Sequence, residues 1–194
     1  MKKLQLLIVL SLIFVLSCNQ DQKKRLSQEA TTEYINKGNQ IAGSSFKALA
    51  SELKAALARG GIPEAIDYCN VQAMPITDSL SEAYNAEIRR TSLKTRNPEN
   101  KPTEIEKEIL LGYQKLQAQG DTLRPAVHLV DNNKILFTAP IMVQPLCLNC
   151  HGEVGKALQE KNYEMIAQRY PQDQATGYNA GDFRGMWSIR FDRE

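Results

Sequence analysis

Residues 126–143, AVHLVDNNKILFTAPIMV, determine the fold class of this chain of 194 residues. Apolar and β-branched residues dominate 126–130 and 134–143, and the turn-forming triplet Asp131-Asn132-Asn133 separates the two runs. This pattern predicts two strands joined by a tight turn. A similar run at 186–191 predicts a strand that closes the sheet.

The longest segments outside the hairpin have helical periodicity. Residues 26–59 predict a helix that begins at the N-cap Ser27 and ends at Gly60-Gly61. A second helix follows Pro63, and we expect Pro75 to kink or split it. The residues expected on the buried faces are Phe46, Leu49, Leu53 and Leu57 in the first helix, and Ile66, Cys69, Ala73, Ile76, Leu80 and Ala83 in the second.

Three shorter segments complete the predicted fold. Residues 89–94 predict a strand, and Thr103-Glu104-Ile105-Glu106 is a capping box that starts a helix ending near Gly120. Residues 154–170 predict a last helix, which stops at Pro171. N-terminal helices followed by strands predict an α+β domain, in which a small antiparallel sheet packs against helices.

The start of the chain resembles the leader of an exported lipoprotein. Lys2 and Lys3 precede an apolar run that ends at Leu16, which is typical of a signal peptide and too short to span a membrane. Val15-Leu16-Ser17-Cys18 is similar to the bacterial lipobox, whose cysteine accepts a diacylglycerol. The alternative is an ordinary signal peptide with an incidental cysteine.

These features predict three parts of the chain. We expect a lipoprotein signal peptide at 1–17, a lipidated tether at 18–26 and a folded domain at 27–194. Acyl chains on Cys18 would anchor the protein to a membrane, facing the periplasm or the cell exterior.

The charge balance excludes one class of partner. The chain has 24 basic and 22 acidic residues, and removal of Lys2 and Lys3 with the leader leaves 22 of each. A domain without a basic surplus lacks the electrostatic attraction that drives nucleic-acid binding, so no nucleic-acid partner is expected.

Cys147-Leu148-Asn149-Cys150-His151 is the attachment motif of c-type haem. The two thiols add to the two vinyl groups on one edge of the porphyrin, and two intervening residues bring both sulfurs to that edge. His151 follows directly and supplies an imidazole ligand to the iron. An export signal supports this interpretation, because covalent haem attachment takes place outside the cytoplasm. We expect one covalently bound haem c.

Three other uses of the paired thiols are less favoured. A zinc site needs a second pair of ligands, and no second paired spacing exists. A thioredoxin-like dithiol belongs at a strand-to-helix junction of a βαβ unit, whereas this motif follows a predicted hairpin. A Cys147–Cys150 disulfide would close a very short loop.

The second axial ligand of the iron is open at this point. His128 is the default from composition, because bis-histidine ligation is common, and methionines more often fill a core. Cysteine arithmetic favours Cys69, since lipid and haem use the other three cysteines and leave Cys69 unpaired. The candidates are Cys69, His128, Met74, Met142, Met165 and Met186.

Four blocks of sequence resemble the PAS-like periplasmic c-type haem domain family, long known only as a domain of unknown function. The resemblance runs from about residue 40 to the C-terminus. The blocks are AIDYCN (65–70), RRTSLK with RNP (89–98), PLCLNCHG (145–152), and YPQDQATGY with GDFRG (170–185). It implies a PAS-like α+β fold, one haem c, and His151 and Cys69 as axial ligands, with a proposed redox-sensing role.

Three alternative functions are compatible with this prediction. A redox or gas sensor would need an unidentified redox or signalling partner, because the chain ends at Glu194 without a signalling module. A periplasmic electron-transfer cytochrome would keep both ligands, and a small haem enzyme such as a peroxidase would need an open iron position, which makes an enzyme the less favoured reading. Basic residues that are candidates for binding haem propionates are Arg89, Arg90, Lys94, Arg96 and Arg184.

Overall fold

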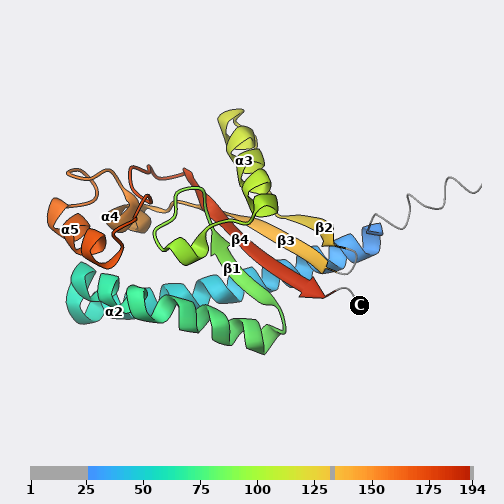
Figure 1. The fold of residues 1–194 in the computed structure, drawn as a ribbon, viewed down its shortest axis with the longest axis horizontal. Coiled ribbons are helices and arrows are strands. Elements are labelled where there is room, and N and C mark those ends of the chain that lie inside the picture. Colours follow the sequence, from blue (N-terminus) through green and yellow to red (C-terminus); the bar gives the residue numbers. More distant parts are fainter. Residues whose placement is uncertain (1–25, 132–133, 193–194) are drawn as a thin grey trace, which may run out of the picture.

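The computed structural model describes residues 26–131 and 134–192, and shows helices packed against one sheet (Figure 1). The predicted α+β class is confirmed. The elements in chain order are α2 (Gln28–Tyr84), β1 (Glu87–Thr91), η1 (Pro98–Asn100), α3 (Glu104–Ala118), β2 (Ala126–Asp131), β3 (Lys134–Met142), η2 (Pro145–Cys147), α4 (Leu148–His151), α5 (Glu160–Arg169) and β4 (Phe183–Asp192).

The four strands form an antiparallel sheet in the order β1-β4-β3-β2. The predicted hairpin of β2 and β3 is confirmed, and β4 closes the sheet by inserting between β3 and β1. Chain segments nearly a hundred residues apart are therefore paired, as in Arg90 opposite Trp187.

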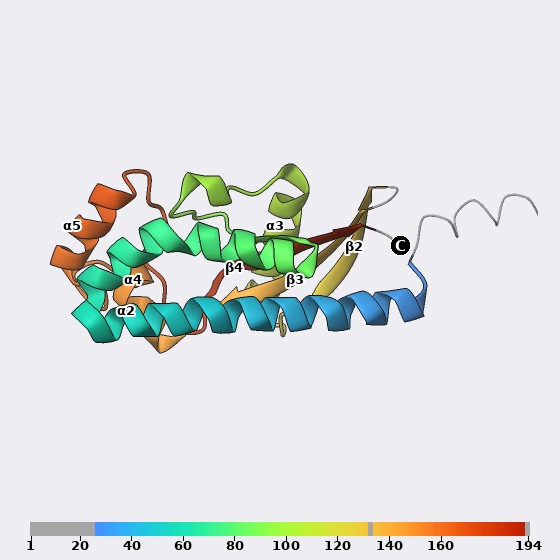
Figure 2. The same ribbon diagram turned by 90° about the horizontal axis from the view of Figure 1, so that it is seen from below.

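The element α2 is a helical hairpin. Ser27 caps its start by accepting a hydrogen bond from the Ala30 amide, as predicted. The helix breaks at Gly60 and Gly61, and Gly61 has φ of 68°, which a residue with a side chain rarely adopts. The second half of α2 then runs back beside the first (Figure 2). The expectation that Pro75 splits the helix is wrong, because the only non-helical residues within α2 are the two glycines.

The hairpin covers one face of the sheet. Side chains alternate along a strand, so Ile135, Phe137 and Ala139 of β3 point to the same face as Trp187 and Ile189 of β4. They form the main apolar core with Tyr34, Ile41 and Ala42 of α2. Phe46 was expected in this core, but it is 57% exposed, because the buried face of the first half runs through Gly38, Ile41, Ala42 and Ser45.

The opposite face of the sheet carries α3. The predicted capping box is present, with the Thr103 side chain and the Glu106 carboxylate each bonded to the other residue's backbone. Glu106 is fully buried and accepts hydrogen bonds from Ser188 of β4 (2.6 Å) and Arg89 of β1 (3.2 Å). Burial alone would raise the pKa of Glu106, but the bonds from Ser188 and Thr103 and the charge of Arg89 hold it below its ordinary value.

Two predicted elements have different bounds in the structure. The first strand spans Glu87–Thr91 rather than 89–94, because the helix ends earlier, at Asn85 in a left-handed conformation. The last helix, α5, spans only Glu160–Arg169, and residues 154–158 form a turn closed by a short bridge between Val154 and Leu158.

The predicted signal peptide (1–17), the lipidated Cys18 and nearly all of the tether lie outside the described residues. Within residues 26–131 and 134–192, no helix combines the length and apolar character needed to cross a bilayer.

Two glycines of α2 allow a matched test of the packing between the hairpin and the sheet. A Cβ atom on Gly38 would lie 2.2 Å from the Phe137 ring, whereas a Cβ on Gly43 would meet nothing within 4 Å. We expect Gly38→Ala to lower the free energy of unfolding by about 1–3 kcal/mol through overpacking. Gly43→Ala should raise it by about 0.5–1 kcal/mol, because alanine favours helix. Chemical denaturation of both variants measures this, and equal effects would contradict the described packing.

Candidate functional site

The paired cysteines lie on one turn of helix at the end of β3. η2 leads directly into α4, so the chain stays helical from Pro145 to His151. Cys147 and Cys150 are three residues apart on this helical segment, and His151 is its last residue. Residues at this helical spacing project from the same side of a helix. Cys147 and Cys150, like Cys69, are free thiols. The turn therefore presents two thiols and an imidazole together.

The His151 ring is fixed by one hydrogen bond. Its Nδ1 lies 2.7 Å from the carbonyl oxygen of Ala175, and since a carbonyl only accepts, Nδ1 carries the proton. The other nitrogen, Nε2, therefore has a free lone pair in the neutral ring, which is the form that binds metals. Burial, followed by the charges of Arg184 and Arg96, holds the pKa of His151 well below its ordinary value. The imidazole is thus neutral at physiological pH.

Arg96 joins the helical turn to the loop that carries Ala175. Its guanidinium donates to the Cys150 carbonyl (2.6 Å), to the Ala175 carbonyl (3.3 Å) and to both oxygens of the Asp173 carboxylate. The ion pair is shielded from water, with 15% of the Arg96 and 2% of the Asp173 side chain exposed. The loop also bonds the turn directly, because the Tyr178 amide donates to the His151 carbonyl.

Cys69 reaches the same end of the molecule from α2. Its neighbour Ile66 packs in an apolar cluster with Leu158 and Ile166, and Cys150 borders that cluster. Burial raises the pKa of the Cys69 thiol, whereas the charges of Arg90 and Arg96 lower it. Burial likewise raises the pKa of Cys150, and Arg96 and Cys69 are among the charges that act on it. The structure therefore gathers Cys69, Cys150 and His151 around the same arginines.

His128 lies elsewhere. It faces the side of the sheet that carries α3, where its Nε2 is 3.4 Å from the Thr138 hydroxyl, which in turn contacts the Tyr113 hydroxyl. Met142 and Met186 also belong to the cluster under α3. Met165 borders the cluster of Ile66 next to Cys150. The charges of Arg90 and Arg96 act on both Cys69 and His151.

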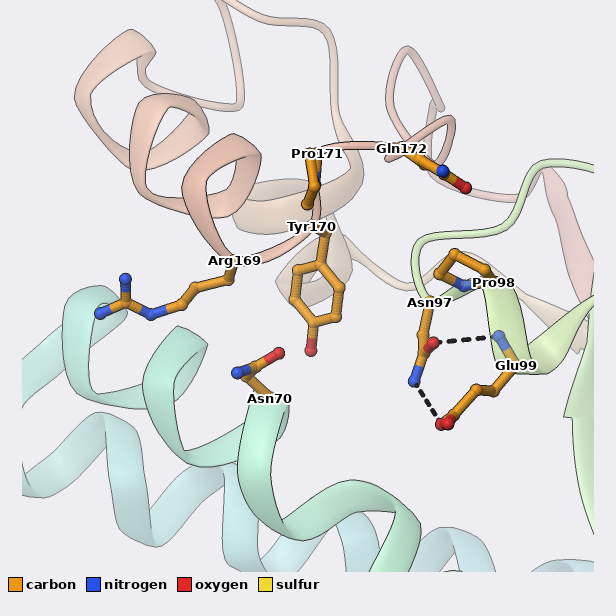
Figure 3. A pocket seen from close by; sticks show the side chains of 8 residues that line it. All are labelled: Asn70, Asn97, Pro98, Glu99, Arg169, Tyr170, Pro171 and Gln172. Carbon is orange, nitrogen blue, oxygen red and sulfur yellow. Dashed lines mark hydrogen bonds between the residues drawn. The ribbon is translucent and has the colours of Figure 1, made fainter.

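A polar cavity of about 390 Å³ borders the site (Figure 3). Asn70 and Tyr170 line one side, and Asn97 and Glu99 line the other, where the Asn97 side chain bonds the Glu99 backbone and carboxylate. The cavity does not contain the paired thiols or His151. Asn70, which directly follows Cys69 in α2, is one of its lining residues.

Two contributors to the site were missed at the sequence level. The Ala175 carbonyl orients His151, yet a backbone carbonyl has no residue signature. Tyr178 packs edge-on against the His151 ring, with the ring centres 6.4 Å apart. The only available signal was that both residues lie in the block at 170–178.

This set of groups fits a covalently attached haem. Two thiols on one helical turn suit the two vinyl groups, and a neutral imidazole with a fixed tautomer suits one axial position. The partly buried thiol of Cys69, on a different element, suits the other axial position. The buried Nε atom of Arg90 also has no hydrogen-bond partner in the described part of the chain, so it is available to an acceptor on a bound group.

Comparison with known proteins identifies a matching family model and a solved structure with a similar fold. Residues 19–191 match the family model described as Tll0287-like. The crystal structure of the cyanobacterial heme-protein Tll0287 aligns with a TM-score of 0.57 and 24% sequence identity, over 87% of this chain and 98% of that chain. The match shows that the two chains share a fold. No curated protein matches the chain.

Proposed function

The chain belongs to the Tll0287-like family, and on that premise we propose that it carries one covalently attached haem c. Family membership confirms the resemblance found in the four sequence blocks, and the antiparallel sheet with its helices confirms the α+β, PAS-like fold. In the proposal, Cys147 and Cys150 form the thioether bonds, and His151 and Cys69 are the axial ligands.

The observation that carries the proposal is the state of His151. Its proton is held on Nδ1 by the Ala175 carbonyl, and burial disfavours a second proton. The ring therefore presents a lone pair from Nε2 next to two thiols that no disulfide joins. In the proposal, this lone pair binds the haem iron and the two thiols react with the haem vinyl groups. When bound, the haem would supply a one-electron couple between ferric and ferrous iron.

We further propose that the protein acts as a redox sensor. The two proposed ligands come from different elements: His151 from a turn held by Arg96, and Cys69 from the second half of α2. Cys69 follows the break at Gly61 by eight residues, early in the second half of α2. Figure 2 shows that the hairpin end of α2 lies beside α4 and α5, and that the first half runs from there to the opposite end of the molecule. A change in how Cys69 is held would act on the hairpin end, where the two halves of α2 meet at Gly60 and Gly61, and the first half leads from there to the N-terminal end of the domain. A redox or signalling partner protein would read that change.

The proposed anchor at Cys18 would place the N-terminal end of α2 next to the membrane. α2 begins at Gln28, ten residues after the proposed lipidated Cys18. The helix whose far end lies near Cys69 would therefore be the part of the domain next to the membrane. This arrangement fits an exported lipoprotein whose output is exerted close to the membrane surface.

Covalent attachment is tested by extraction. The full chain, expressed with export and a cytochrome c maturation system, should retain haem after denaturation and acid–acetone treatment. Replacement of both Cys147 and Cys150 by serine should abolish retention, because no thioether bond forms. Haem that is fully extracted from the wild-type protein would overturn the assignment.

The axial ligands are tested by a pair of single substitutions. We expect a low-spin ferric spectrum of thiolate/imidazole type that is lost in Cys69→Ala and kept in His128→Ala, because His128 bonds Thr138 on the other face of the sheet. Carbon monoxide should bind the reduced wild-type protein only after a slow step. A Cys69→Ala spectrum identical to wild type would exclude thiolate ligation, and failure to bind carbon monoxide at all would favour an electron-transfer cytochrome over a sensor.

The anchor is tested by fractionation. The wild-type protein should sediment with membranes and partition into detergent, because acyl chains on Cys18 bury their methylene groups in lipid. Cys18→Ser should release the protein or leave its signal peptide uncleaved. A wild-type protein that is cleaved at another residue and recovered in the aqueous fraction would contradict the lipoprotein assignment.

A further inference from the structure

Two successive arginines of β1 face opposite sides of the sheet. Arg89 points to the α3 side, where it donates to Glu106 and to the carbonyls of Glu99 and Lys101. Arg90 points to the α2 side, where its guanidinium lies 6.0 Å from the ring centre of its strand partner Trp187. Side-chain alternation along the strand therefore sends only Arg90 towards Cys69.

Arg90 is the arginine of the site whose hydrogen-bonding capacity is unused. Its Nε atom is buried, and no atom in the described part of the chain accepts a hydrogen bond from it. Arg96, by comparison, is occupied by Asp173 and two carbonyls. A buried donor without an acceptor is destabilising, so such donors are normally satisfied by protein, water or a ligand.

The charges around Arg90 lack a counter-anion. Burial lowers the pKa of Arg90, Arg184 lowers it further, and the groups that oppose this are Cys69 and Tyr170, which are neutral unless deprotonated. Arg184 donates to the Lys94 carbonyl and lies over the Tyr178 ring, without an ion pair among the described residues. The carboxylate of Asp173 is already paired with Arg96. Two positive charges thus remain without a carboxylate partner of their own.

We propose that Arg90, together with Arg184, binds the two propionate carboxylates of the haem. This inference rests on the proposed function. A porphyrin dianion, a ferric ion and one thiolate sum to zero charge, so the two propionates carry the entire remaining charge of the group. Two guanidinium groups without partners match it in sign and in number. Arginine suits this role because its donors match the geometry of a carboxylate.

Arg190 provides the matched control. It lies on β4, and its buried Nε atom also has no partner in the described part of the chain. Alternation places it on the α3 face, the same side as Ser188 and Met186 and opposite to Cys69. Arg190→Gln therefore reproduces the loss of a buried arginine from the sheet without touching the proposed haem site.

The experiment compares haem-loaded wild type, Arg90→Gln, Arg90→Lys and Arg190→Gln by resonance Raman spectroscopy and redox titration. We expect Arg90→Gln to shift the propionate bending band and to move the midpoint potential to more negative values, since loss of the cation favours the ferric state. Arg90→Lys should shift the band but move the potential less, because it keeps the charge and loses the Nε donor. Arg190→Gln should match wild type in both measurements.

The outcomes separate this inference from the proposed function. A wild-type protein without covalent haem would overturn both. Retained covalent haem with wild-type Raman bands and potential in Arg90→Gln would overturn only the role of Arg90. A shift of the iron–sulfur band without a shift of the propionate band would also overturn it, and would assign Arg90 to the Cys69 sulfur. If Arg90→Gln fails to accumulate, the propionate band of Arg90→Lys decides the question alone.

Discussion

The geometry of the site depends on the Arg96 guanidinium. It holds the turn that carries the paired cysteines and the loop of Asp173 and Ala175 in one fixed relation. Removing one partner of a buried ion pair leaves an uncompensated charge, so neither side chain is easily replaced. The Ala175 carbonyl in turn accepts a hydrogen bond from Nδ1 of His151. The orientation of the imidazole therefore depends on Arg96 through Ala175. The metal-binding form of the histidine is thus set by a contact that involves no metal.

The sheet distributes basic residues between two tasks. The strand alternation that sends Arg89 to the buried carboxylate of Glu106 sends Arg90 to the opposite face. On the first face the charge is fully compensated and fastens α3 to the sheet. On the second face the charge is left without a partner, next to Cys69. Arg89 therefore serves the fold, whereas Arg90 is left available for the proposed contact with the propionates. A shift of one residue in the strand register would exchange them.

Features with a local cause could be predicted from the sequence. The cap at Ser27, the capping box at Thr103 and the hairpin at 126–143 depend on neighbouring residues, and each is present. The break at Gly60-Gly61 was predictable because a left-handed conformation favours glycine. The prediction that Pro75 splits the helix was wrong. A proline removes only one helical hydrogen bond, and the packing of α2 against the sheet keeps the helix intact.

Features with a non-local cause could not be predicted. The five basic residues considered as propionate ligands looked equivalent in sequence, and only the pairing of β1 with β4 separates Arg90 from Arg89. The bond from His151 to Ala175 spans 24 residues and ends on a backbone carbonyl. The paired cysteines and His151 were visible because their chemistry requires a fixed local spacing, whereas their surroundings are set by the fold.

The two ends of the molecule differ in how they are stabilised. This difference is relevant to the proposed redox sensing. Beneath the sheet, α2 packs in the largest apolar cluster, which includes fully buried residues such as Phe137 and Ile189. At the site, the second half of α2 packs through a smaller cluster around Ile66, next to cationic groups without anions. Buried charge without a partner lowers local stability, and an anionic ligand that supplies the partner restores it. Elements that move are drawn from regions of low local stability. If the haem binds as proposed, the segment that carries Cys69 would be the part of α2 whose order depends most on the bound group, whereas the part under the sheet is held by the apolar core.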